Sequence, residues 1–158
     1  MIVGSALNKY KSKTKFECEI ENLITNDIRD RIIFTGFVDY SEIYKYYKIA
    51  DIVILPSIIE DSAPLTIIEA LSCGVPIITT DSGGIPEYAV NNSAIILPRN
   101  DELVYNITKS IDKLLNDENL INQLSYQTKM VSKELTSAKF YQNFIDIMIK
   151  SNGREKKL

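Results

Sequence analysis

Three acidic residues and the start of one predicted helix lie close together in the sequence and could bind a polar ligand. Glu60 and Asp61 come just before the predicted helix, and Glu69 lies inside it. The first turn offers the backbone N–H groups of Leu65 and Thr66, and the helix dipole favours an anion such as a diphosphate there. The carboxylate of Glu69 has two acceptor oxygens, which suit the paired hydroxyls of a ribose.

The same acidic residues also have a simpler interpretation. Glu60 and Asp61 could form a solvated loop whose negative charge suits the start of a helix, and Glu69 could be an exposed helix residue. On spacing alone, this simpler interpretation is the favoured one.

A second stretch that could approach a ligand is rich in glycine. Gly83 and Gly84 follow a predicted strand, and adjacent glycines allow positive φ angles and a close approach of the backbone to a ligand. The pattern is not a dinucleotide-binding fingerprint. An ordinary tight turn, with Pro86 and Glu87 beginning one helical turn, explains it equally well.

Composition excludes several kinds of chemistry. The chain has no histidine, which excludes Ser-His-Asp and Cys-His catalysis and His-ligated zinc within it, and no metal site is expected. The net charge of −3 argues against nucleic acid as a partner. No segment approaches the ~20 apolar residues of a transmembrane helix. Cys18 and Cys73 form no CxxC pattern, which indicates a reduced, cytoplasmic protein, and we expect Cys73 to be buried and inert.

Short β-branched runs alternate with longer amphipathic runs along the chain. The sequence predicts strands at 2–3, 31–34, 52–55, 76–79 and 94–97. It predicts helices at 9–25, 41–49, 64–73, 101–116, 119–132 and 137–150. We therefore expect one domain over residues 1–150, followed by a polar tail over 151–158.

This order of elements predicts an α/β fold, a Rossmann-like three-layer domain with a parallel sheet and a helical C-terminus. In such sheets, ligands bind outside the carboxyl ends of the strands. The loops expected at those ends are Gly4-Ser5, 36–39, 56–63 and 81–87.

Four ordered motifs carry a resemblance to a known family. They are Phe34-Thr35-Gly36-Phe37-Val38, the run from Tyr47 to Ser57, the run from Glu69 to Ile78, and Ser82-Gly83-Gly84-Ile85-Pro86-Glu87. Together they resemble the C-terminal, nucleotide-sugar-binding domain of family 4 retaining glycosyltransferases. The resemblance extends over nearly the whole chain and implies the C-terminal half of a GT-B fold, in which the active site lies between two Rossmann-like domains.

The resemblance also implies roles for individual residues. The family signature is two glutamates separated by seven residues; the second matches Glu69, which would hold the ribose hydroxyls. The first matches Asp61, whose shorter side chain would contact the donor sugar near its reacting carbon. Gly36 and Val38 match the loop that meets the nucleotide base. Pro64 replaces a common glycine of the family, so the resemblance implies that the N–H groups of Leu65 and Thr66 would bind the phosphates. It also implies that Gly83 and Gly84 would shape their loop.

The implied reaction is transfer of a sugar from a nucleotide diphosphate sugar to an acceptor with retention, without a metal or cofactor. The chain starts after the family's basic pair and lacks an acceptor domain, so we expect it to need an acceptor domain or chain. Exposed apolar surface could form a homodimer. Two other interpretations stay open: a catalytically inactive truncated remnant, or the donor-binding subunit of a split transferase.

Overall fold

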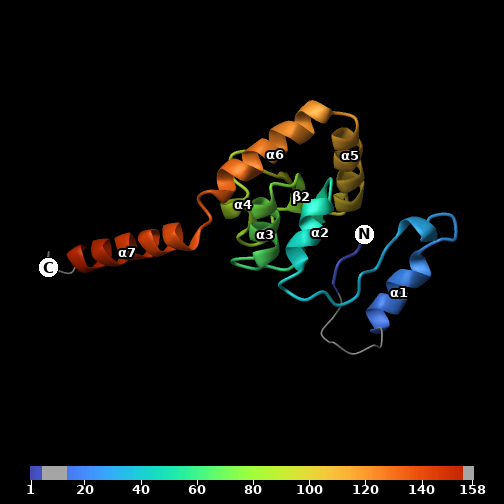
Figure 1. Ribbon diagram of the computed structural model, residues 1–158, viewed down its shortest axis with the longest axis horizontal. Helices are drawn as coiled ribbons and strands as arrows, with labels where there is room; N and C mark the ends of the chain where they lie inside the picture. The colour runs from blue at the N-terminus through green and yellow to red at the C-terminus, as the bar shows by residue number, and fades with distance from the viewer. Residues whose placement is uncertain (5–13, 155–158) are drawn as a thin grey trace. The chain divides into compact units, whose positions relative to one another are not determined.

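The computed structural model describes residues 1–4 and 14–154, and these fall into two compact units. The first unit is Met1–Tyr46 and the second is Tyr47–Leu158 (Figure 1). The expectation of one domain over 1–150 stays a prediction.

The first unit contains helix α1, Lys15–Leu23, which begins at a capping box. The Thr14 hydroxyl accepts the Glu17 N–H, and the Glu17 carboxylate accepts the Thr14 N–H. The helix was expected to extend to about Thr25 but ends at Leu23, and its expected start at residues 9–13 lies outside the described residues.

The prediction of a strand at 31–34 is wrong for the first residue of that range. The 3-10 helix η1, Arg29–Arg31, occupies its start. Among the described residues, only Phe34 of this run pairs, through a single parallel bridge with Ile2. Ile33 is 60% exposed. Helix α2, Ile43–Ile49, ends where expected.

The second unit contains a three-stranded parallel sheet in the order β1-β2-β3, which confirms the predicted parallel arrangement. The strands are β1, Val53–Leu55; β2, Ile77–Thr80; and β3, Ile95–Leu97. Val53 pairs with Ile77, and Ile78 pairs with Ile95. Because all three strands are parallel, their carboxyl ends meet at one edge of the sheet.

Helices cover both faces of this sheet, which confirms the three-layer expectation. Ile77 and Ile78 are fully buried neighbours on β2 and point to opposite faces. Ile77 packs in one cluster with residues of three helices, which are α3 (Leu65–Cys73), α4 (Ile85–Tyr88) and the end of α6 (Glu118–Ser132). Ile78 packs in the other with α5, Leu103–Leu115, and the start of α6.

Helix α7, Ser137–Arg154, is longer than its expected range of 137–150. It continues through part of the predicted polar tail, and the last four residues of that tail lie outside the described residues. Polar side chains do not end a helix whose backbone hydrogen bonds continue, so polarity alone misplaced this boundary. Exposed apolar residues on α7 are Phe140, Tyr141, Phe144, Ile147, Met148 and Ile149. Within the described part of the chain, no helix is both long and apolar enough to span a membrane.

Candidate functional site

The loop that follows β1, residues 56–63, is joined to the end of β2 by side-chain hydrogen bonds. The buried Thr80 hydroxyl donates to the Ser57 carbonyl oxygen at 2.5 Å. The buried Ser82 hydroxyl donates in the same way to the Ile59 carbonyl oxygen at 2.5 Å. These bonds use the hydroxyls of two buried residues to satisfy loop carbonyl groups, which fixes the path of the loop's backbone.

Gly83 and Gly84 permit a still closer approach of the same loop. The Gly84 N–H donates to the Asp61 carbonyl oxygen at 2.8 Å. A Cβ at Gly83, where φ is +49°, would lie 2.2 Å from that oxygen, and a Cβ at Gly84 would lie 2.1 Å from the Ser62 carbonyl oxygen. Only glycine fits at either position, so the glycine pair lets the backbone of the acidic loop approach closely.

Glu60 has specific partners although its side chain is 66% exposed. Its Oε2 accepts the Gly83 N–H at 2.7 Å, and its Oε1 lies 2.5 Å from Nη1 of Arg99. The Arg99 hydrogen bond, followed by that of the Gly83 amide, lowers the pKa of Glu60 below its ordinary value. Glu60 is therefore an exposed loop residue, as the simpler interpretation holds, and two partners fix its carboxylate.

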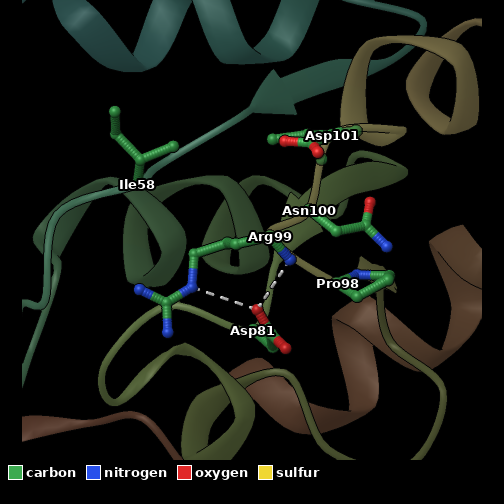
Figure 2. Close-up of a pocket in the computed structure, with 7 residues that line it drawn as sticks. Ile58, Asp81, Pro98, Arg99, Asn100 and Asp101 are labelled. Atoms are coloured by element: carbon green, nitrogen blue, oxygen red, sulfur yellow. Dashed lines mark hydrogen bonds and ion pairs between the residues drawn. The ribbon is translucent and has the colours of Figure 1, made fainter.

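Arg99 follows β3 and also pairs with Asp81, which follows β2. Figure 2 shows the guanidinium and the backbone N–H of Arg99 both directed at the Asp81 carboxylate. Nε lies 3.1 Å and the backbone nitrogen 3.3 Å from Oδ1 of Asp81. Asp81 and Arg99 line an open pocket of about 510 Å³ whose other walls include Ile58 and Asn100. The two carboxylates raise the pKa of Arg99, so it stays charged.

Asp61 is exposed at the start of α3. Its Oδ1 accepts the Ala63 N–H at 3.0 Å, which orients the carboxylate within the turn before the helix. Pro64 is the N-cap of α3, and the Ile67 N–H donates to the Pro64 carbonyl oxygen at 3.2 Å. The amides of Leu65 and Thr66 therefore precede the first backbone hydrogen bond of the helix. The side chains of Leu65 and Thr66 are exposed.

Glu69 is half-buried on α3 and is bound by a tyrosine from α2. The Tyr47 hydroxyl donates to Oε2 of Glu69 at 3.1 Å and lies 3.5 Å from the Thr66 carbonyl oxygen. Burial, followed by the nearby Glu69 charge, raises the pKa of Tyr47, so its phenol stays protonated as a donor. Glu69 is therefore not the freely exposed helix residue of the simpler interpretation.

The structure brings the predicted site residues together in two groups within the second unit. Asp61 contacts the glycine pair Gly83 and Gly84, and Thr66 and Glu69 meet at the Tyr47 hydroxyl. In the first unit, Gly36 has φ +67° and forms an antiparallel bridge with Gly4, and Val38 is half-buried.

Sequence reasoning missed the roles of Tyr47 and Arg99. The rule that points to loops at the carboxyl ends of strands applies to β3 as well, and it would have found Arg99 in the loop after that strand. Tyr47 carries no comparable signal, because its contact with Glu69 depends on how α2 packs against α3.

Cys73 is half-buried, so the expectation of full burial is wrong. It is the last residue of α3 and packs against the apolar cluster while remaining partly exposed. Burial still raises the pKa of the Cys73 thiol, and the Lys48 charge opposes part of this effect. Cys18 is exposed.

Comparisons with known sequences identify a family and several relatives. The model of the family "Glycosyl transferases group 1" matches residues 1–131. An uncharacterized glycosyltransferase of Methanocaldococcus jannaschii is 30% identical over 92 residues, which are 57% of this chain and 23% of that protein. The chain therefore spans about a quarter of the length of this curated relative.

Solved structures with the same fold cover most of the chain. Anabaena HepE in complex with UDP-glucose aligns with a TM-score of 0.73 at 20% identity, over 94% of this chain and 40% of that one. Sucrose-phosphate synthase from Thermosynechococcus elongatus aligns with a TM-score of 0.70 at 24% identity, over 97% and 37% of the two chains. These alignments confirm the predicted α/β fold.

Proposed function

The chain belongs to the group 1 glycosyl transferases, and from this premise we propose that its second unit binds the nucleotide diphosphate sugar donor of a retaining sugar transfer. Its fold is that of the α/β domain that makes up part of GT-B enzymes. The observation that carries the proposal is the acidic loop, which is fixed by the Gly83-Gly84 turn directly before the start of α3. This start lies beside the carboxyl ends of the strands, where α/β sheets bind ligands.

Each part of the donor has a matching group in this proposal. The first amides of α3, at Leu65 and Thr66, bind the diphosphate, because a helix start offers N–H groups and a favourable dipole to an anion. Glu69 accepts hydrogen bonds from the ribose hydroxyls. Asp61 contacts the sugar near its reacting carbon.

We keep, as a separate proposal, the base contact that the resemblance assigns to two residues of the first unit. Gly36 and Val38 meet the nucleotide base. The chemistry is then positioning of the donor and stabilisation of the departing diphosphate, which needs fixed donors rather than a nucleophile.

Sugar transfer as a whole is a further proposal, because the chain matches only 37% to 40% of the length of the solved proteins described above. Transfer requires an acceptor to be held near ~3–3.5 Å from the reacting carbon and shielded from water. We assign donor binding to these 158 residues and acceptor binding to a further domain or chain.

A calorimetric screen tests the proposal. The 158-residue chain is titrated with UDP, GDP, UDP-glucose and GDP-mannose, with inorganic phosphate and glucose as controls. Saturable binding of at least one nucleotide, with neither control binding comparably, is the expected result. Heats that do not saturate with any nucleotide or nucleotide sugar would contradict donor binding by this chain.

A further inference from the structure

Tyr47 provides a fixed hydrogen-bond donor to one oxygen of Glu69. The hydroxyl donates to Oε2 at 3.1 Å, and the aromatic ring packs against the apolar cluster that contains Ile67 and Leu71. Tyr47 is half-buried and has only two side-chain torsions, so its hydroxyl is held with little freedom. A rigid donor is therefore directed at a side chain that is intrinsically flexible.

Glutamate loses considerable rotamer freedom when its carboxylate binds a ligand. In this chain, the contact with Tyr47 restricts the carboxylate of Glu69 before any ligand arrives. Within the described residues, the hydrogen bond uses Oε2, and Oε1 remains available to accept from a ligand hydroxyl. Preorganisation of this kind raises affinity because less freedom is lost on binding.

The tyrosine also remains a donor across the working pH range. Because its pKa lies above the ordinary value, its phenol does not ionise near neutral pH and does not repel the Glu69 carboxylate. The hydrogen bond from a neutral donor to a charged acceptor is of the stronger kind.

We propose that Tyr47 is a positioning residue that holds the Glu69 carboxylate in the orientation that recognises the ribose hydroxyls of the donor. The inference rests on the proposed function, because it assumes that Glu69 meets the ribose. Tyr47 acts through Glu69 and does not itself touch the donor.

The test compares nucleotides that differ by one ribose hydroxyl. Calorimetry measures the dissociation constants of UDP and 2′-deoxy-UDP, and of GDP and 2′-deoxy-GDP, and their ratio gives the ribose discrimination. The variants are Tyr47→Phe, Glu69→Ala and the matched control Tyr46→Phe, which removes a hydroxyl from the neighbouring residue of α2. A purely structural role for Tyr47 would weaken both nucleotides alike and leave the ratio unchanged.

The wild-type chain and the three variants are expected to differ in their ribose discrimination. The wild-type chain prefers the ribonucleotide by about tenfold or more, the scale of a hydrogen bond to a charged group. Glu69→Ala brings the ratio near one, Tyr47→Phe lowers it at least about threefold, and Tyr46→Phe retains it.

Two other results would overturn the inference and can be told apart. If Glu69→Ala abolishes discrimination but Tyr47→Phe retains the wild-type ratio, Tyr47 does not position Glu69, and the proposed donor site stands. If no nucleotide binds, or Glu69→Ala leaves the ratio unchanged, the ribose role of Glu69 fails and the inference fails with it. Circular dichroism and thermal unfolding confirm that each variant is folded; should Tyr47→Phe not fold, Tyr47→Leu takes its place.

Discussion

Arg99, two residues after the end of β3, forms an ion pair with Glu60 in the loop after β1, with 2.5 Å between Nη1 and Oε1. Asp81, directly after β2, holds the same guanidinium through Nε. One side chain therefore joins the loops that follow all three parallel strands, at the edge of the sheet where the proposed donor site lies.

Replacement of Arg99 by glutamine is expected to raise the pKa of Glu60 toward the ordinary glutamate range. In the wild-type chain, Arg99 and the Gly83 amide lower this pKa, so the contact is complete at neutral pH and is lost as the pH falls through the lowered value. The measurement is a pH titration of the Glu60 side-chain carbonyl signal by carbon NMR.

Lys113→Gln is the control for this titration, because it removes a positive charge from α5 and leaves Arg99 in place. It should leave the Glu60 titration unchanged. An ordinary glutamate titration in the wild-type chain, or one that Arg99→Gln does not move, would contradict the ion pair.

Gly83→Ala is expected to destabilise the chain more than Gly74→Ala does. Both glycines have positive φ angles, +49° and +73°, so both variants carry the strain of a left-handed conformation. At Gly83 the new Cβ would also meet the Asp61 backbone at 2.2 Å, whereas at Gly74 it meets only the flexible Lys129 side chain. We expect an extra cost of ~1–3 kcal/mol from this overpacking.

Urea unfolding followed by circular dichroism measures the difference between the two glycine variants. Equal losses in both would show that the Asp61 loop moves away freely and that the glycine does not fix its path.

Cys73 is expected to react with a disulfide reagent more slowly than Cys18 at pH 8. Burial raises the pKa of the Cys73 thiol and lowers the fraction of reactive thiolate, whereas Cys18 is exposed. The rates are measured separately in the variants Cys18→Ser and Cys73→Ser, each of which retains one thiol. Equal rates in the folded variants, or faster reaction at Cys73, would refute this expectation.

Sequence patterns predicted the second unit well because its central strand, β2, is buried on both faces. The β-branched run that contains Ile77 and Ile78 indicates a strand covered by helices, and the structure confirms it. The run at 31–34 has a similar composition, but its strand depends on pairing at a single bridge, and composition does not report pairing. The end of α7 was missed because a polar segment is compatible with both a helix and a tail.

The candidate site was predictable only where the sequence contains a motif. Asp61 and Glu69 were selected because the resemblance matches them to the two acidic positions of the family signature, and their roles remain proposals. The partners that fix these residues, Gly84 for Asp61 and Tyr47 for Glu69, lie on other elements. Long-range hydrogen bonds of this kind arise from tertiary packing, which spacing along one helix does not encode.

The affinity of the chain for its nucleotide, measured before and after Glu69→Ala, tests the central claim most directly. Glu118→Ala is the matched control, because it removes an exposed glutamate from the first turn of α6. The donor-site account predicts that Glu69→Ala weakens the nucleotide that binds best by ~1–3 kcal/mol, while Glu118→Ala leaves its dissociation constant unchanged. An unchanged dissociation constant in Glu69→Ala, with the variant folded, would contradict the account.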